Sequence, residues 1–228
     1  MSTDPSASRR KAPIERAAEI ARAAREIALD EGLSALTLRA VASRIGVTPA
    51  LVSHYQPSMD SLVASTFGAI VAAEIGEVAE ELAPCETSVA ALQTLIDTLL
   101  GPARSTVTAV WLDAWSLGRR HPALAVEVGV QMDAWQAFLA VLLNTGCARG
   151  EFRAIDPDAV AWQLLAIIDG LNAHAIVRYG QAQRLRGLVR TVAEHELGLR
   201  SGALGPGDDS GRRPEPDPPP ASITVPVC

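Results

Sequence analysis

Four tryptophans are the residues of this sequence best suited to binding a small organic molecule. Aromatic residues make up only 4% of the 228 residues, yet Trp111, Trp115, Trp135 and Trp162 all lie within one stretch of the chain. Trp111 and Trp115 are four residues apart, so they share one face of a predicted helix. Because aromatic side chains commonly wall ligand pockets, we predict that the four tryptophans line a ligand cavity. Packing in an ordinary hydrophobic core is the alternative for each of them.

No pattern of residues predicts catalysis or metal binding. The four histidines fall on different predicted elements, no glycine-rich phosphate loop occurs, and Asp156 and Asp158 look like charges at the start of a helix. The three cysteines Cys85, Cys147 and Cys228 are scattered and lack metal-ligand spacing. We therefore expect no metal, no cofactor and no enzymatic activity, and a helical enzyme is the weaker hypothesis. The cysteines also favour a reducing compartment.

The composition predicts an all-α protein. Hydrophobic residues make up 48% of the chain, with alanine and leucine dominant and strand-forming aromatics scarce. No stretch alternates as a strand would, and none approaches the roughly 18 apolar residues of a membrane span. The N-terminus has no apolar signal core. These features predict a cytoplasmic protein without a membrane partner.

Proline, glycine and composition divide the chain into four parts. Residues 1–12 are expected to form a disordered basic arm, 13–57 a first domain, 58–200 a second domain of about six helices, and 201–228 a disordered tail. The first helix is predicted to begin at Pro13 and to end at Gly32 in a left-handed cap. Its predicted inner face consists of alanines and one isoleucine at helical spacing: Ile14, Ala17, Ala21, Ala24 and Ala28.

Residues 38–55 have the pattern of a helix-turn-helix. Thr37 is placed to cap a short helix that ends at Arg44, and Thr48 to cap a second helix that begins at Pro49 and ends near Tyr55. The turn between them needs a positive φ angle, which Gly46 adopts at little cost. Small and apolar residues occupy the positions where the two helices must touch: Val41, Ala42, Ile45, Val47 and Val52. The alternative is an ordinary helical hairpin.

This segment resembles the TetR family of transcription regulators. The similarity covers residues 14–62, including the run from Gly46 to Leu62, and Ser53-His54-Tyr55 is similar to the BetI-like branch, which is related to the choline–betaine repressor. It continues more loosely through residues 111–124 and 168–171. The resemblance implies an N-terminal three-helix DNA-binding domain followed by a helical domain for ligand binding and dimerisation. The family usually has a lysine where Met59 stands and an aromatic residue where Gln56 stands.

The resemblance also implies which residues contact double-stranded DNA. Arg39 would read a guanine, since a bidentate arginine matches guanine O6 and N7. The tip of the recognition helix would lie in the major groove, and further polar side chains would contact phosphates. The implied set is Thr37, Arg39, Thr48, Pro49, Ala50, Leu51, Ser53, His54 and Tyr55. The charge distribution agrees weakly, because residues 1–60 hold eight basic residues, Arg39 and Arg44 among them, against seven acidic ones.

Two helices near the C-terminal end of the second domain predict a homodimer. The segment Ala159–Val177 is apolar almost all round, and Asp169 and Asn172 are among the few interruptions. A helix of this kind must be buried on every side. The next helix carries a narrower apolar stripe of Leu185, Leu188, Val192 and Leu199. Pairing of these two helices with those of a second copy agrees with where the family dimerises, and an internal core is the alternative.

Together these features predict a ligand-responsive repressor that binds a palindromic operator as a homodimer and is released by a small-molecule inducer. The inducer's identity is open, with an organic cation as one candidate, because aromatic faces attract cations and the resemblance is to a branch that includes a choline sensor. Asp113 or Asp169 would supply the counter-charge, so the expected ligand-binding set is Trp111, Asp113, Trp115, Trp135, Trp162, Asp169 and Asn172. A transcriptional activator or a ligandless DNA-binding module of the same fold is the alternative.

Overall fold

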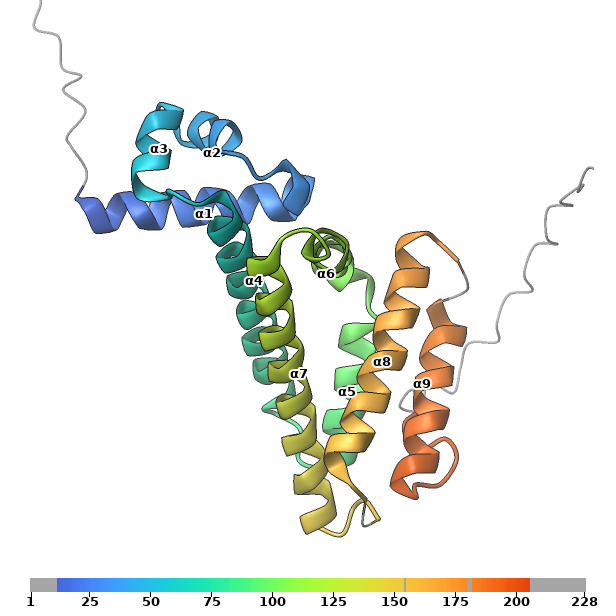
Figure 1. Cartoon of the computed structure of the whole chain (residues 1–228). Helices are drawn as coiled ribbons and strands as arrows, with labels where there is room; N and C mark the ends of the chain where they lie inside the picture. Colours follow the sequence, from blue (N-terminus) through green and yellow to red (C-terminus); the bar gives the residue numbers. More distant parts are fainter. Residues whose placement is uncertain (1–11, 154, 180–181, 206–228) are drawn as a thin grey trace, which may run out of the picture.

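The computed structural model describes residues 12–153, 155–179 and 182–205, and within them every regular element is a helix (Figure 1). The α-helices are α1 (Pro13–Glu31), α2 (Leu38–Ile45), α3 (Pro49–Tyr55), α4 (Met59–Leu82), α5 (Ser88–Leu99), α6 (Ser105–Gly118), α7 (Pro122–Ala148), α8 (Pro157–Ile176) and α9 (Ala182–Leu197). Two short 3-10 helices, η1 (Leu33–Ala35) and η2 (Pro102–Arg104), precede α2 and α6. The predicted all-α fold is confirmed.

The first three helices form the small domain expected from the sequence. The hydroxyl of Thr37 accepts a hydrogen bond from the Ala40 N–H at 3.0 Å, and that of Thr48 accepts one from the Leu51 N–H at 3.4 Å. Both side chains therefore act as N-caps, as expected. Gly46 ends α2 at a φ angle of 68° and a ψ angle of 38°, the left-handed conformation that a residue without Cβ adopts most easily.

The buried face of α1 differs from the predicted one. Ile20 and Ile27 are fully buried with Val41 and Val52 of the next two helices, whereas Ile14 is 85% exposed. Ala17 and Ala21 of the predicted face are exposed as well. Burial of a large side chain stabilises more than burial of an alanine, so the two isoleucines, one heptad apart, determine which face turns inward. The expected face was wrong for the N-terminal half of α1.

The long helix α4 joins the small domain to a bundle made of α5 to α9 (Figure 1). Ser58 caps its start by accepting a hydrogen bond from the Ser61 N–H at 3.2 Å. The bundle core includes Phe67 and Ile70 of α4 and Leu139 and Leu143 of α7, all buried. At the edge of the bundle, α8 and α9 lie side by side with one face uncovered by other helices of the chain (Figure 1).

Three helices, α4, α7 and α8, are long and apolar enough to cross a membrane by length and composition, with mean hydropathies of 1.5, 1.3 and 1.3. No uninterrupted apolar run of this length occurs in the sequence, because polar residues interrupt each helix, so the expectation of no span-length apolar segment did not include these three helices. In the fold all three are bundle helices, and α7 packs against both α4 and α8. However, only 28% of the apolar window of α8 is buried within one chain. Much of the apolar surface of α8 is therefore exposed in the single chain.

Residues 201–205, expected at the start of a disordered tail, instead turn back onto the bundle, and the side chain of Leu204 is fully buried. The carboxylate of Glu194 accepts hydrogen bonds from the backbone N–H groups of Gly202 and Leu204, at 3.0 and 2.8 Å. One buried leucine and two satisfied backbone donors hold this turn in spite of its polar composition. Residues 206–228 and the expected arm at 1–11 lie outside the described residues.

Candidate functional site

The exposed surface of α2 and α3 carries the residues expected to contact DNA. Most of them are exposed: Thr37, Arg39, Thr48, Pro49, Ala50, Ser53 and His54. Leu51 and Tyr55 are half-buried, and Tyr55 packs against the core of the small domain. Tyr55 therefore has a structural role whether or not it reaches a phosphate. The hydroxyls of Thr37 and Thr48 already cap helices, which leaves each of them its own proton to donate.

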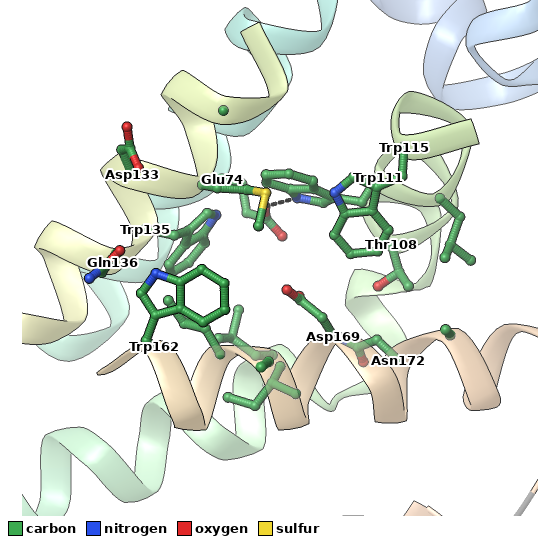
Figure 2. Close-up of a pocket in the computed structure, with 18 residues that line it drawn as sticks. Glu74, Thr108, Trp111, Trp115, Asp133, Trp135, Gln136, Trp162, Asp169 and Asn172 are labelled. Atoms are coloured by element: carbon green, nitrogen blue, oxygen red, sulfur yellow. Dashed lines mark hydrogen bonds between the residues drawn. The ribbon is translucent and has the colours of Figure 1, made fainter. Parts of the chain in front are cut away.

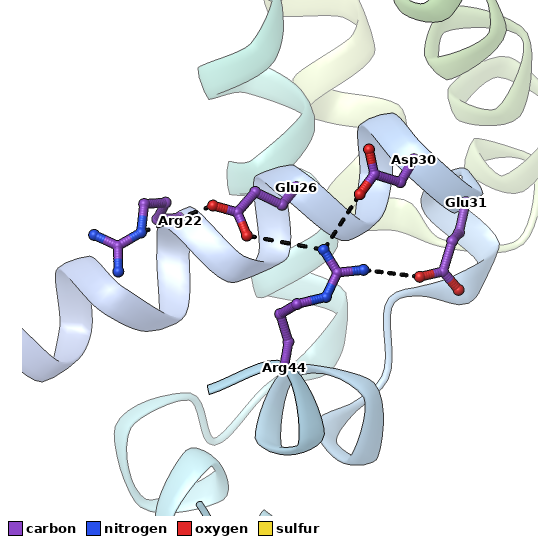
Figure 3. A network of polar contacts seen from close by, with 5 residues as sticks. All are labelled: Arg22, Glu26, Asp30, Glu31 and Arg44. Carbon is purple, nitrogen blue, oxygen red and sulfur yellow. Dashed lines mark hydrogen bonds and ion pairs between the residues drawn. The ribbon is translucent and has the colours of Figure 1, made fainter. Parts of the chain in front are cut away.

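Arg39 and Arg44 lie on the same helix but have different surroundings. The guanidinium of Arg44 turns back to α1, at 2.9 Å from Glu31 and 3.3 Å from Asp30, with Glu26 at 3.8 Å (Figure 3). The charge of Arg44 is therefore neutralised by acidic residues of its own domain, and Arg44 does not belong to the expected basic surface. Arg39 is exposed and makes no hydrogen bond or ion pair with any described residue. Arg39 is thus available to a ligand outside the domain.

Met59, where the resemblance leads one to expect a lysine, lies at the first position of α4. Its side chain is half-buried against the core of the small domain, beside Leu62 and Tyr55. Because the helix N-terminus carries a partial positive charge, the backbone there can still attract a phosphate. Gln56 is also half-buried at the junction of α3 and α4. The two departures from the family pattern are thus accommodated within a well-formed fold.

A cavity of about 390 Å³ lies in the bundle between α4, α5, α6, α7 and α8. All four tryptophans of the chain line it, and so do Asp169 and Asn172 (Figure 2). Trp111 and Trp115 are close together, with ring centroids 5.6 Å apart, while Trp162 at the mouth is 58% exposed. Six of the seven residues expected to bind a ligand therefore line one cavity. Thr108, Met132 and Gln136 complete its polar and apolar walls.

Asp113 does not line the cavity, and placing it there was wrong. It lies on α6 between Trp111 and Trp115 in sequence, and the helical twist turns it away from both. Its Oδ2 atom accepts a hydrogen bond from the Leu33 N–H at 2.9 Å. A Cβ atom at Gly32 would lie only 2.6 Å from the same oxygen, so glycine, at a φ angle of 89°, permits this approach. Asp113 thus ties α6 to the end of α1.

A polar contact also joins the start of α7 to the start of α4, where α4 leaves the small domain. The Nδ1 atom of His121, which precedes α7, lies 3.0 Å from the carboxylate of Asp60 in the first turn of α4. Among the helices that wall the cavity, α4 and α6 therefore contact the small domain, and α7 contacts the start of α4.

Glu74 is the cavity residue that the sequence prediction missed. It is only 6% exposed, and its Oε2 atom accepts a hydrogen bond from the Trp111 indole N–H at 3.3 Å (Figure 2). A signal was present in the sequence, because Glu74 follows Phe67, Ile70 and Val71 at helical spacing and therefore falls on the buried face of α4. A charged residue on an otherwise apolar inner face commonly has a partner or a function.

Burial shifts the acid–base behaviour of both cavity carboxyls. Desolvation raises the pKa of Glu74, although the Trp111 indole N–H and the charge of Arg104 oppose this. Arg104 makes its own ion pairs with Glu77 and Glu81, at 2.8 and 2.9 Å. Desolvation alone raises the pKa of Asp169 from 3.8 to about 6. The cavity thus holds two carboxyls that are costly to keep charged.

Replacing Asp169 by asparagine is expected to stabilise the unliganded protein near pH 7.5. Because the pKa of Asp169 rises from 3.8 to about 6 on folding, the folded state binds more protons between these values and loses stability as the pH rises through them. At pH 7.5 the loss is about 1–3 kcal/mol, and Asp169→Asn removes it. Chemical denaturation at one protein concentration should show a higher free energy of unfolding for Asp169→Asn than for the unsubstituted protein. This difference should shrink as the pH falls toward 4. The exposed Asp133→Asn is the control, and a gain that grew at low pH would contradict the assignment.

The uncovered face of α8 and α9 carries the expected dimer contacts only in part. Leu188 is 51% exposed, whereas Val192 and Leu199 are half-buried and pack against the bundle core of their own chain. Val189 and Ala193 fix this orientation of α9, because both are fully buried. The side chain of Leu185 lies outside the described residues. Among the described side chains, Leu188 is the predicted contact that is most available to a second copy.

Two family models match the chain in sequence. Residues 20–66 match the bacterial regulatory proteins of the tetR family, and residues 88–198 match the C-terminal domain of BetI-type transcriptional repressors. The chain belongs to the TetR family of transcriptional regulators. The helix-turn-helix of α2 and α3 is accordingly its DNA-binding element, and the helices from α5 onward form its C-terminal domain. No curated protein matches this regulator in sequence.

Solved structures share the fold of this TetR-family regulator. A protein from Rhodococcus sp. described as a TetR-family transcriptional regulator is 18% identical, with a TM-score of 0.69 over 81% of this chain and 99% of its own. A transcriptional regulator from Saccharomonospora viridis, solved in complex with choline, is 23% identical, with a TM-score of 0.69 over 81% and 98%. A third, from Pseudomonas aeruginosa PAO1, is 16% identical, with a TM-score of 0.68 over 85% and 95%. At these identities the likeness concerns the fold.

Proposed function

We propose that this TetR-family regulator is a cytoplasmic repressor that binds a pseudo-palindromic operator as a homodimer and leaves it when a small organic molecule enters the tryptophan-lined cavity. The observation that carries the proposal is the position of that cavity. Its walls include α4, which follows the helix-turn-helix, and α6, which is hydrogen-bonded through Asp113 to Leu33 of η1, directly after α1. A ligand in the cavity therefore contacts the elements that hold the DNA-binding domain in place.

The DNA-binding part of the proposal rests on α2 and α3. The tip of α3, with Thr48, Pro49 and Ala50 exposed, offers methyl groups and few hydrogen bonds to the major groove. Such a surface can contact the methyl group of thymine, while the exposed Arg39 can bind a guanine. Ser53 and His54 are exposed on α3 and can contact phosphates. One such surface reads only a half-site, so two copies held about 34–36 Å apart are needed for a full operator.

The dimer rests on the apolar surface that a single chain leaves uncovered. α8 and α9 lie side by side with Leu188 of α9 exposed, and Val177, which follows α8, is 73% exposed. Gly170 on α8 is exposed and has no side chain, which allows close approach of a second helix. Packing of both helices against their symmetry mates would cover this surface in an isologous interface. A two-fold axis there also matches the symmetry of a palindromic operator.

The inducer is proposed to be a small organic cation. Four indole rings surround the cavity, and aromatic faces attract a desolvated cation by about 2 kcal/mol. Glu74 and Asp169 add negative charge from α4 and α8. A structural relative at 23% identity was solved in complex with choline, which is itself a cation. On binding, a cation that pulls on Glu74 would shift α4, and one that presses on Trp111 would shift α6 and its contact with α1. The two DNA-binding domains would then no longer fit successive major grooves.

The experiment that tests the DNA-binding part is selection of bound duplexes from a random library by the full-length protein. The proposal predicts enrichment of pseudo-palindromes whose half-site centres are one helical turn apart, about 10 base pairs, or a multiple of it. The affinity for the selected duplex should fall steeply with salt, because phosphate contacts release counterions. Enrichment of sequences without two-fold symmetry would contradict the dimeric arrangement. An activator of the same fold would select similar DNA but raise transcription from it.

A further inference from the structure

The hydrogen-bonding groups of the cavity indicate which donors the ligand carries, in addition to the sign of its charge. Three acidic residues line the cavity, Glu74, Asp133 and Asp169, and no lysine, arginine or histidine is among the described residues of its lining. Asp133 is exposed at the mouth. Arg104, whose charge acts on Glu74, is held by two other glutamates. The negative charge deep in the cavity is thus left for a ligand to neutralise.

The two inner carboxylates also have acceptor positions to spare. An ionised carboxylate can accept about four hydrogen bonds. Glu74 receives one at 3.3 Å from the Trp111 indole N–H, and the Trp135 side chain also interacts with it. Asp169 accepts no hydrogen bond and makes no ion pair with any described residue. Figure 2 shows Asp169 projecting from α8 into the space between the tryptophans, where a ligand can reach it.

A quaternary ammonium ion would leave these acceptors unsatisfied, because it has no N–H group. Indole faces alone suffice to hold such an ion. By contrast, buried acceptors are costly unless each receives a hydrogen bond, and bonds between two charged groups are the strongest ones. Glu74 and Asp169 come from different walls of the cavity, α4 and α8, so N–H donors at two positions of one ligand would satisfy both. The indole rings and aliphatic side chains of the lining suit the apolar part of such a ligand.

We propose that the cavity recognises a protonated organic amine with N–H donors at two positions, rather than a quaternary ammonium ion, and that Glu74 and Asp169 are its hydrogen-bond acceptors. This inference rests on the proposed function, since it concerns the inducer of the same cavity. Burial raises the pKa of both carboxyls in the empty protein, and a bound amine would favour their charged forms. The affinity for the amine should therefore rise as the pH increases through about 6, where Asp169 loses its proton.

The test compares three probes of one chain length: 1,6-diaminohexane, its fully N-methylated bis-quaternary analogue and 1,6-hexanediol. Tryptophan fluorescence and calorimetry on the full-length protein at pH 7.5 give each affinity. We expect the diamine to bind at least about tenfold more tightly than either of the others, since a hydrogen bond to a charged group is worth about that factor. Glu74→Gln and Asp169→Asn should each lower the affinity for the diamine by about tenfold and lower the affinity for the bis-quaternary probe less. Glu80→Gln, which removes an exposed charge of α4 outside the cavity lining, should change all three affinities little.

Circular dichroism shows whether each variant is folded, and Asp169→Asn is isosteric. The inference would be overturned if the bis-quaternary probe bound as tightly as the diamine or more tightly. It would also be overturned if Glu74→Gln lowered the affinities for both cations equally. If the bis-quaternary probe also released the selected operator and the diamine did not, the inference would fail while the proposed function remained. If no probe bound but the operator did, both the inference and the proposed inducer site would be overturned, and DNA binding would stand.

Discussion

Placing a negative charge at Leu188 is expected to split the dimer and to weaken operator binding by about hundredfold or more, because the gain from joining two half-site contacts is lost. Leu188 is 51% exposed on α9, while Val189 and Ala193 beside it hold the helix to its own bundle. A glutamate at position 188 therefore remains in water in the monomer but would be buried unpaired in the proposed interface, which is costly. Sedimentation and duplex binding at one salt concentration measure both effects.

The matched control for this variant is Val141→Glu. Val141 is 66% exposed on α7 and borders a groove lined by residues near α4, α5 and α7, with none from α8 or α9, so it receives the same change in chemistry outside the proposed interface. Val141→Glu should leave the dimer mass measured by sedimentation and the affinity for the operator unchanged. Val192→Glu is a poorer test than the sequence suggested, because Val192 packs against the core of its own chain and its substitution would also destabilise the fold. A dimer that persisted in Leu188→Glu with full operator affinity would place the interface elsewhere.

Removing the side chain of Arg39 is expected to weaken binding to the selected operator by about 1–3 kcal/mol and to relax the preference at one base pair in each half-site. The reason is that Arg39 is exposed on α2 without a partner among the described residues, so its donors are free for a guanine. Binding to unrelated duplexes should change much less. Competition binding with single-base variants of the operator measures this preference.

Arg44→Ala provides the control, since it removes the same side chain from the same helix. Arg44 is committed to Asp30 and Glu31 of α1, and exposed ion pairs of this kind contribute about 0–1 kcal/mol to stability. Its loss should lower the melting temperature slightly and leave base preference intact. If Arg39→Ala behaved in the same way, with specificity unaltered, Arg39 would contact a phosphate or nothing at all.

The local elements of the DNA-binding domain could be predicted because their signals lie within a few residues. Thr37 and Thr48 cap the helices that follow them, and Gly46 takes the left-handed conformation that the turn requires. The orientation of α1 was harder to predict. Its alanines fit several helical stripes equally well, and only packing against α2 and α3 selects the stripe that contains Ile20 and Ile27.

The cavity illustrates both the reach and the limit of sequence patterns. The tryptophans come together from α6, α7 and α8, as predicted from their rarity in the chain. The prediction for Asp113 was wrong, because residues that are neighbours in sequence point in different directions on a helix. Glu74 comes from α4, far from the tryptophans along the chain, so its membership depends on tertiary packing. The short turn at Leu204 was missed for the same reason, since its donors bond to Glu194 on α9.

The most direct test of ligand-responsive repression is the reciprocity of the two binding events. A cation that changes the tryptophan fluorescence is titrated calorimetrically into the free protein and into the protein saturated with its selected operator. In parallel, the affinity of the labelled operator is measured with and without the same compound. If the compound acts by releasing the protein from DNA, it lowers the affinity of the protein for the operator by some factor. The operator must then lower the affinity of the protein for the compound by the same factor. A compound that bound in the cavity with equal affinity in both states would contradict ligand-responsive repression.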